Sequence, residues 1–351
     1  MSLNPGATIG IIGGGQLGRM LAMAASRLGY KSIILDPQQN APAFQCSHEN
    51  IITSYDDPEG LKLLAERCDV ITYEFENVDV SAVESLESRL PCHPSSAALA
   101  TSQDRLVEKQ FFNDLGIATA GYRAVGSSAE LEEALNAFEG NGILKTRRFG
   151  YDGKGQIRIA GRNQESVEAA AKLAEDTPCI LEAFVPFTRE VSVVAARGQL
   201  GETICFDVAQ NVHRDGILHT STIPAIVDEA LAENAVAIAG TVLKALDYIG
   251  VLAIEFFVGE DNQLLVNEFA PRVHNSGHWT EAACTISQFE QHIRAVAGLP
   301  LGETTRHSNC VMQNLIGDEV DQWQDIQRQP QTLLHLYGKE ETRPGRDGTK
   351  Y

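Results

Sequence analysis

Two glutamates on one predicted β-hairpin are the first residues whose spacing suggests chemistry. Residues 252–269 read LAIEFFVGEDNQLLVNEF, two apolar runs around a polar turn, which is typical of a hairpin. With the turn centred on residues 261–262, Glu255 lies opposite Glu268, and their Cβ atoms are expected roughly 5 Å apart. Facing carboxylates repel unless a cation joins them, and Mg²⁺ prefers oxygen ligands. The hairpin therefore predicts a magnesium site. Asn267 points to the opposite face in an ideal strand, so it contributes only if a local bulge turns it toward the glutamates. The alternative is one buried acid paired with an arginine and one exposed acid.

A basic, glycine-rich segment precedes this hairpin. Residues 143–158 read ILKTRRFGYDGKGQIR, with five basic residues in a chain that is acidic overall. Lys145 ends a short apolar run, from which a lysine can reach nucleotide phosphates. The mobile glycines Gly150, Gly153 and Gly155 suit a loop that covers phosphates. The segment is not the G-x-x-x-x-G-K-[ST] sequence, which excludes a P-loop here. The alternative is a solvated basic hairpin.

A short apolar run follows, with one acid in it. Residues 180–185 read ILEAFV, and their backbone could hydrogen-bond an adenine edge while Glu182 accepts from the exocyclic amine. Glu190 could accept from ribose hydroxyls. Each glutamate alone is more often an ordinary surface residue, and only their combination favours a nucleotide site.

A polar segment follows the hairpin directly. Residues 270–280 read APRVHNSGHWT, and such a loop at a strand end suits a polar, phosphorylated substrate. His274 fits either a general base or a hydrogen-bonded structural histidine. Lys339, Arg343 and Arg346 form a second cationic group near the C-terminus, which alone would be a solvated tail.

A glycine loop near the N-terminus suggests an anion site. Gly13, Gly15 and Gly18 fit G-x-G-x-x-G between a strand and a helix, and Asp36 ends the next strand where a ribose-binding acid would lie. Taken alone, this pattern predicts a dinucleotide-dependent dehydrogenase. The loop could equally hold a substrate phosphate, because glycines let backbone N–H groups approach an anion closely. It could also be a tight turn without a ligand.

Composition limits the class of protein. The 351 residues include 28 Lys and Arg against 47 Asp and Glu, a formal charge of −19, which argues against nucleic acid or an anionic membrane surface as partner. The 43% hydrophobic content is that of a folded globular protein. The seven cysteines lack zinc-site spacing, so free thiols in a reducing compartment are expected. No signal peptide or membrane-length apolar run is evident, and we expect a soluble, cytoplasmic protein.

The elements that must position these residues fall into successive groups. Strand and helix patterns alternate through the first 95 or so residues, which predicts a doubly wound parallel sheet. A small α+β region with short strands follows. Longer strands come after Val191, then a helix at 228–247 and the hairpin. The stretch 298–351 has weaker periodicity and several turn signals.

Five sequence segments together resemble a known family. They are IGIIGGGQLGRM, TYEFENV, GYDGKGQ, QNVHRDGIL and NEFAPRVHNSGHWT. On these segments the whole chain resembles the ATP-grasp ligases, and among them the N5-carboxyaminoimidazole ribonucleotide synthetases of purine biosynthesis. The resemblance implies an α/β and α+β fold with three domains. These are a Rossmann-like domain at 1–97, an ATP-grasp domain at 98–295 with a lid at about 118–185, and a small domain at 296–351.

The resemblance also implies a reaction. ATP would phosphorylate bicarbonate to carboxyphosphate, and the amine of 5-aminoimidazole ribonucleotide would attack this intermediate or CO₂ released from it. The products would be the carbamate, ADP and phosphate, and the family is typically a homodimer that uses Mg²⁺. One alternative is another ATP-grasp ligase of the purine pathway that uses formate or glycine. Another is a non-catalytic nucleotide-binding protein.

Site residues follow from the resemblance position by position. The ATP-binding residues would be Arg105, Lys145, Gly150, Tyr151, Asp152, Gly153, Lys154, Gly155, Gln156, Glu182, Ala183, Phe184, Val185, Glu190, His213, Asn267 and Glu268. The substrate-binding residues would be Gly15, Gln16, Leu17, Glu74, Arg272, His274, Asn275, Ser276, Lys339, Arg343 and Arg346. The catalytic residues would be Tyr151, Asp152, Lys154, His274 and Asn275, and the metal ligands Glu255 and Glu268.

Two positions depart from the family pattern. The family usually has an acid where this chain has Gln210, before the Asn-x-His of residues 211–213. The family tail also differs from this chain after Arg346, where the sequence reads DGTKY and stops.

Overall fold

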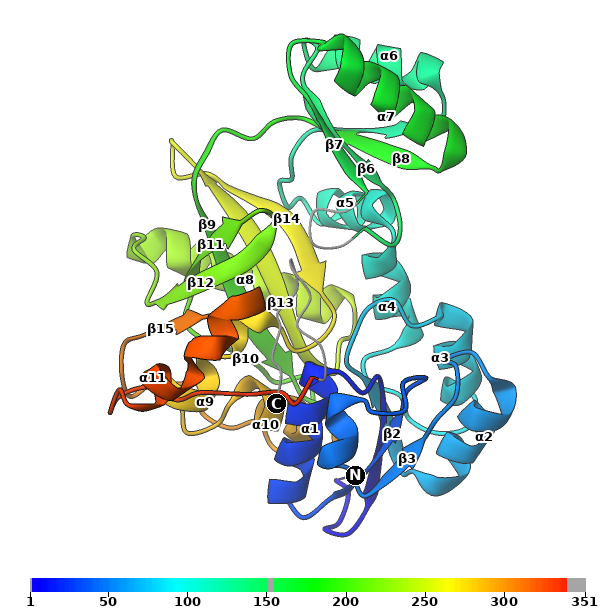
Figure 1. Cartoon of the computed structure of the whole chain (residues 1–351), viewed down its shortest axis with the longest axis vertical. Helices are drawn as coiled ribbons and strands as arrows, with labels where there is room; N and C mark the ends of the chain where they lie inside the picture. The colour runs from blue at the N-terminus through cyan, green and yellow to red at the C-terminus, as the bar shows by residue number, and fades with distance from the viewer. Residues whose placement is uncertain (1, 151–154, 340–351) are drawn as a thin grey trace. The chain divides into compact units, whose positions relative to one another are not determined.

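The computed structural model describes residues 2–150 and 155–339 and divides the chain into two compact units. Unit 1 comprises Met1–Leu99, Ser192–Ile254 and Phe269–Tyr351, and unit 2 comprises Ala100–Val191 and Glu255–Glu268. The division into domains at 1–97, 98–295 and 296–351 stays a prediction. Figure 1 gives the element labels that are used below.

The N-terminal sheet in unit 1 has four parallel strands in the order β3-β2-β1-β4. Their apolar side chains are almost continuously buried, as expected for strands that are covered on both faces. This order is the start of a doubly wound sheet, so the predicted fold of this region is confirmed. The elements are β1 (Thr8–Ile12), α1 (Gln16–Arg27), β2 (Lys31–Leu35), η1 (Pro42–Gln45), β3 (Glu49–Ile51), α2 (Pro58–Arg67), β4 (Val70–Tyr73) and α3 (Val80–Glu87).

A seven-stranded sheet has the order β14-β13-β9-β11-β12-β15, and β10 pairs with β9. The predicted helix at 228–247 is present as α8, which begins after the N-cap Asp228. The elements are β9 (Phe187–Arg197), β10 (Thr203–Cys205), β11 (Ala209–Arg214), β12 (Ile217–Ile223), α8 (Glu229–Ala245), β13 (Gly250–Gly259), β14 (Leu264–Ala270), η2 (Asn275–Gly277), α9 (Thr280–Ala283), α10 (Gln288–Val296), β15 (Cys310–Gln313), η3 (Gly317–Gln322) and α11 (Trp323–Gln327).

A small antiparallel sheet in unit 2 has the order β5-β8-β6-β7. Helices α6 and α7 lie side by side over it (Figure 1), and their buried leucine and alanine side chains join the strands in one core. Side chains of Ser127 and Asn163 cap these two helices. The elements are α4 (Ser96–Gln103), α5 (Arg105–Asp114), β5 (Tyr122–Val125), α6 (Ser128–Ala137), β6 (Gly142–Thr146), β7 (Gln156–Ile159), α7 (Gln164–Asp176) and β8 (Cys179–Glu182).

The β13–β14 hairpin differs from its predicted form by one residue at the turn. The loop has three residues, 260–262, because the N–H of Gly259 donates to the carbonyl of Gln263 at 2.9 Å. The turn centred on residues 261–262 is therefore wrong. Asn262 adopts a left-handed φ of 62°, which asparagine tolerates and which a three-residue hairpin loop requires.

The burial pattern slips by one residue further along β14. Burial alternates as far as Val266, but Asn267 and Glu268 are both half-buried and Phe269 is buried again. This one-residue slip in the pattern indicates a β-bulge, in which two residues oppose one on the partner strand. Glu255, Asn267 and Glu268 are all half-buried, which is the pattern expected if the three share one face of the hairpin.

Candidate active site

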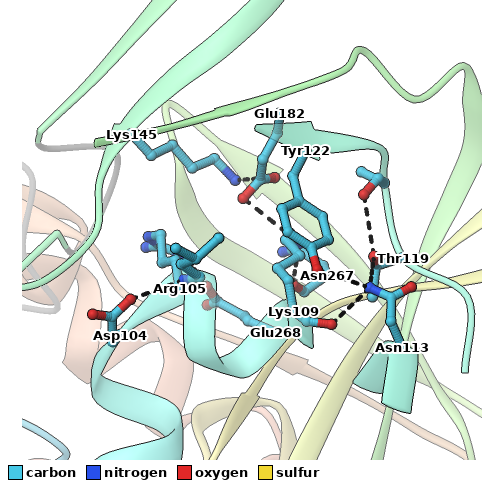
Figure 2. A network of polar contacts seen from close by, with 12 residues as sticks. Asp104, Arg105, Lys109, Asn113, Thr119, Tyr122, Lys145, Glu182, Asn267 and Glu268 are labelled. Atoms are coloured by element: carbon cyan, nitrogen blue, oxygen red, sulfur yellow. Dashed lines mark hydrogen bonds and ion pairs between the residues drawn. The ribbon is translucent and has the colours of Figure 1, made fainter. Parts of the chain in front are cut away.

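A cluster of charged side chains gathers in unit 2 from four elements (Figure 2). Arg105 and Lys109 project from α5, Lys145 from β6 and Glu182 from β8, and they meet Asn267 and Glu268 on β14. Three cations and two carboxylates therefore lie together, partly inside the protein. Such a cluster can bind an anion on its cationic side and a cation on its carboxylate side.

Glu182 is the buried centre of this cluster, with only 3% of its surface exposed. One carboxylate oxygen lies 2.9 Å from Nζ of Lys145 and the other 3.6 Å from Nζ of Lys109. Strands β6 and β8 are antiparallel neighbours, and Ile143 pairs with Glu182, which places Lys145 diagonally across from Glu182 on the same face. Burial raises the pKa of Glu182, but the two lysines outweigh burial and hold that pKa below its ordinary value.

Lys109 is a member of the cluster that the sequence analysis missed. Its side chain is 1% exposed, and Nζ donates to the main-chain carbonyl of Asn267 at 2.9 Å. It therefore links Asn267 on β14 with Glu182. The available signal was its spacing from Arg105, because residues four apart share one face of a helix.

Arg105 connects the carboxylate strand with the glycine segment. Its guanidinium donates to Glu268 at 2.9 Å and to the carbonyl of Gly150 at 3.4 Å. The preceding residue, Asp104, caps α5 by accepting from the N–H of Leu106, and it also accepts two hydrogen bonds from Arg147 at 2.7 and 3.0 Å. The first residues of the basic glycine segment are thereby fixed to the start of α5.

The half-buried face of the hairpin suits Mg²⁺. It carries two carboxylates, Glu255 and Glu268, and the amide of Asn267, whose Oδ1 is buried without a hydrogen-bond partner among the described residues. Within residues 2–150 and 155–339, no group of three or more His, Cys, Asp or Glu side chains could hold a metal alone. Two carboxylates and one amide oxygen fit Mg²⁺, which usually takes its remaining ligands from water and phosphate.

The glycine loop in unit 1 already holds a carboxyl group, and this group is a side chain of the protein itself. The N–H groups of Gly15 and Gly18, at the start of α1, donate to the carboxylate of Glu74, which follows β4. A Cβ at Gly15 would lie 2.5 Å from a Glu74 oxygen, so only glycine permits this approach. Burial raises the pKa of Glu74 to about 7, and the two N–H donors only partly offset this effect.

Asp36 does not have the role that the dinucleotide pattern predicts. It is 3% exposed, and it accepts hydrogen bonds from the N–H of Gly14 and the hydroxyl of Tyr55, both at 2.7 Å. These bonds hold the glycine loop itself. The expectation of a ribose-binding acid is therefore wrong, because a buried carboxylate occupied by internal donors cannot also receive ribose hydroxyls.

A second polar cluster of unit 1 joins residues from distant parts of the sequence. Nζ of Lys339 donates to the side chain of Gln16, 323 residues away, next to the glycine loop. Arg272 forms a two-bond ion pair with Glu76, which lies two residues after Glu74. The N-terminal loops thus contact the segment after β14 through Arg272, and Lys339 through Gln16, within one unit.

Comparisons with known proteins identify the family to which this fold and site belong. Residues 6–103 match the ribonucleotide synthetase preATP-grasp domain, 110–289 the ATP-grasp domain, and 310–346 the phosphoribosylaminoimidazole carboxylase C-terminal domain. A Brucella melitensis N5-carboxyaminoimidazole ribonucleotide synthase is 59% identical over 98% of this chain and 95% of its own. This chain belongs to the N5-carboxyaminoimidazole ribonucleotide synthase family.

Solved structures of the synthase family agree with the fold. The Staphylococcus aureus synthetase with ADP superposes with a TM-score of 0.94 at 38% identity, covering 98% of this chain and 92% of that one. The Aspergillus clavatus synthase with ADP and 5-aminoimidazole ribonucleotide has a TM-score of 0.90 at 31% identity, covering 97% and 92%. The predicted ATP-grasp fold is confirmed, and the dehydrogenase interpretation of the glycine loop is wrong.

The other residues expected from the synthase resemblance lie on several elements. Ala183, Phe184 and Val185 follow β8, and Arg158 stacks 4.6 Å from the ring centre of Phe184. Gln156 begins β7, Glu190 lies on β9, and His213 lies on β11 at a register shift. Gly155 has a left-handed φ, Leu17 is in the first turn of α1, and Asn275 begins η2.

Some expected synthase residues lie outside the described residues. They are Tyr151, Asp152, Gly153, Lys154, Arg343 and Arg346.

None of the helices in the described part of the chain has the length and apolar character of a membrane span.

Proposed function

We propose that this protein carboxylates 5-aminoimidazole ribonucleotide with ATP and bicarbonate, yielding N5-carboxyaminoimidazole ribonucleotide, ADP and phosphate. The names and bound molecules of its relatives support this activity. The observation that carries the proposal is the cluster of unit 2, in which Arg105 pairs with Glu268 of the β13–β14 hairpin and Lys145 pairs with Glu182 at the end of β8. A nucleotide triphosphate with its Mg²⁺ needs both kinds of group.

The unit 2 cluster would bind MgATP. Arg105 and Lys145 would contact phosphate oxygens, and the glycine segment that starts at Gly150 would cover them. Glu255, Glu268 and Asn267 would hold Mg²⁺, which when bound neutralises charge on the phosphates. The main chain of residues 183–185 would receive the adenine edge, since the carboxylate of Glu182 is engaged by two lysines.

The chemistry proceeds in two transfers. An oxygen of bicarbonate attacks the γ-phosphorus, ADP leaves, and carboxyphosphate forms. The amine of the ribonucleotide then attacks the carbonyl carbon of carboxyphosphate, or of CO₂ released from it, and loses one proton while phosphate departs. Water must be excluded from this site, because acyl phosphates hydrolyse.

The polar residues of unit 1 would hold the ribonucleotide. Gln16, Leu17 and Gly15 lie at the start of α1, and Lys339 lies against Gln16, where a cation can meet the substrate phosphate. Arg272, Asn275, Ser276 and Glu74 complete this set. His213 and Glu190 stay predicted for the ATP site, and Tyr151, Asp152, Lys154, His274 and Asn275 stay predicted for catalysis.

Two further properties belong to the proposal. We expect a homodimer, as the family resemblance implies, and sedimentation analysis of the purified protein tests it. We also expect a cytoplasmic location, which is supported by seven cysteines that form no disulfide within the described residues.

A phosphate-release assay tests the function. Release should require Mg²⁺, ATP, bicarbonate and 5-aminoimidazole ribonucleotide together, and formate or glycine should not replace bicarbonate. Equal turnover with formate or glycine would favour another ligase of the pathway, and no turnover with all four components would refute the proposal.

Variants of the hairpin test the magnesium ligands. Glu255→Gln and Glu268→Gln should raise the Mg²⁺ concentration needed for half-maximal rate by about tenfold or more. Glu260→Gln, in the exposed turn of the same hairpin, is the matched control and should leave the rate unchanged. Unchanged Mg²⁺ dependence in both carboxylate variants would place the metal elsewhere.

A further inference from the structure

A chain of buried hydrogen bonds ends on the ring of His274. Ser221 on β12 donates to Oδ1 of Asn211 at 2.8 Å, and Nδ2 of Asn211 on β11 donates to Ser192 at 2.9 Å. Ser192 on β9 donates to the hydroxyl of Ser276 at 2.8 Å, which lies 2.9 Å from Nδ1 of His274. All four relay residues are at most 4% exposed, so water does not compete with these bonds. Ser221, Asn211, Ser192 and Ser276 together form a hydrogen-bond relay.

The relay has one direction. An asparagine side chain accepts at Oδ1 and donates at Nδ2, and each serine hydroxyl has a single proton. The direction follows from the inner end: the main-chain N–H of Ser276 makes Nδ1 of His274 an acceptor, so Ser276 donates to Nδ1, Ser192 to Ser276, and Nδ2 of Asn211 to Ser192. The proton of Ser276 then points to Nδ1 of His274. Asn211 and Ser221 are directly opposed in the β11–β12 register, which brings the two side chains of the outer end together.

A main-chain contact assigns Nδ1 as an acceptor. The main-chain N–H of Ser276 also points to Nδ1 of His274, at 3.3 Å, as the N-cap of η2. A backbone N–H can only donate, so Nδ1 carries no proton. Gln288 holds the His274 main chain from both sides, accepting from its N–H at 2.9 Å and donating to its carbonyl at 2.7 Å. The ring is therefore anchored as well as oriented.

We propose that the relay holds His274 as the neutral tautomer with its proton on Nε2, so that His274 donates a hydrogen bond to the substrate and does not accept the amine proton. An imidazole with a proton on Nε2 has no lone pair there, and its only basic nitrogen, Nδ1, faces two donors. In this proposal His274 is not the general base. The relay serines and Asn211 are positioning residues, because they act through His274. The identity of the hydrogen-bond acceptor rests on the proposed function, but the tautomer is a property of the free protein.

The tautomer can be measured directly. Full-length protein with ¹⁵N-labelled histidine would be examined by long-range ¹H–¹⁵N correlation near neutral pH, and His274→Gln would identify the His274 signals by their absence. The expected result is an unprotonated Nδ1 and a protonated Nε2. A protonated Nδ1, or a doubly protonated ring, would overturn the inference even in a fully active enzyme. An inactive enzyme with the expected tautomer would instead refute only the proposed function.

A single substitution should reverse the relay. In Asn211→Asp the carboxylate has only acceptors, so Ser192 and Ser221 both donate to it. Ser276 then donates to Ser192, and its oxygen is left to accept a proton from Nδ1. We expect the His274 signals to shift toward a protonated Nδ1, and the carboxylation rate to fall on the order of 10²-fold, as for loss of one aligned donor.

Matched variants keep the test decisive if the buried aspartate prevents folding. Ser221→Ala removes the outermost donor and leaves the bonds of Ser276 to His274, so the tautomer should stay as in the parent protein. Ser276→Ala leaves only the 3.3 Å main-chain bond and should give a mixture of tautomers. An unchanged tautomer in Ser276→Ala would show that the relay does not set it.

Discussion

Glu182→Gln isolates the charge at the centre of the unit 2 cluster. Glutamine has nearly the same size as glutamate but carries no charge, so packing is preserved while the cluster loses its buried anion. Lys145 and Lys109 would remain close to each other, at sites where their shared partner lay 2.9 and 3.6 Å away. The variant therefore leaves two positive charges together inside unit 2.

The expected loss of stability is large. At an effective dielectric constant of about 20, the two attractions amount to ~6 and ~5 kcal/mol before burial is counted. Burying the three ions costs much of this, and removal of one partner from a buried pair typically costs ~3–5 kcal/mol. We expect the free energy of unfolding of unit 2 to fall by that amount in Glu182→Gln.

The pH dependence of this loss gives a second check. The lysines hold the pKa of Glu182 below its ordinary value of 4.5 in spite of burial. A lowered carboxyl pKa contributes stability that is present above the unfolded-state pKa and is lost as pH falls through the folded-state pKa. The difference between the parent protein and Glu182→Gln should therefore be full at neutral pH and shrink below about pH 4.

Urea unfolding, monitored by hydrogen exchange in peptides that cover β8, measures this loss of stability within unit 2. Glu133→Gln, an exposed change on α6, is the control and should stay within about 0.5 kcal/mol of the parent protein. A loss below about 1 kcal/mol in Glu182→Gln, or a loss that persists unchanged at low pH, would refute this account of the cluster.

Three further predictions follow from other buried groups. The pKa of Glu74 is raised to about 7, so the parent protein should lose ~3 kcal/mol of stability relative to Glu74→Gln as pH rises from about 4.5 to above 7, measured by urea unfolding. Burial lowers the pKa of His292 to about 3, so stability should fall by ~1.4 kcal/mol per pH unit below about pH 6.5. His292→Gln should reduce this slope in a series of thermal unfolding curves, whereas the exposed His307→Gln should not. Lys109→Met removes the bond to the Asn267 carbonyl and should raise the Mg²⁺ concentration for half-maximal phosphate release about tenfold, with the exposed Lys172→Met as control; equal Mg²⁺ dependence in the two variants would contradict this role.

The sequence predicts the fold well where hydrophobic periodicity decides it. Alternating strands and helices predicted the parallel sheet, and α8 lies within its predicted range. Register is harder to predict, because a single backbone conformation can change it. The left-handed Asn262 lengthens the hairpin loop, and the burial pattern of β14 slips by one residue at Asn267-Glu268. The proximity of Glu255 and Glu268 therefore stays a prediction, and the turn from which it was reasoned is wrong.

The candidate site shows which side chains a linear pattern does not reveal. Lys109 lies on a helix whose pattern predicts only an amphipathic surface, and a lysine there is normally solvated. Its burial depends on Glu182 and Asn267, which come from strands far along the chain. Glu74 is a similar case. The glycine pattern indicates an anion at the start of α1, but only the fold shows that a carboxylate of the same chain fills that position.

Both sites therefore contain charges that are already paired within the chain. Arg105 lies 2.9 Å from Glu268, so a phosphate that attracts Arg105 and a Mg²⁺ that attracts Glu268 compete with the same ion pair. In the proposed function, phosphate or Mg²⁺ binding alone would break the Arg105–Glu268 pair and leave one of its two charges without a new partner. Binding of phosphate and metal together replaces both, since each charge then gains a new partner of opposite sign. The geometry thus favours the metal–nucleotide complex over free Mg²⁺ or free nucleotide as the species that binds.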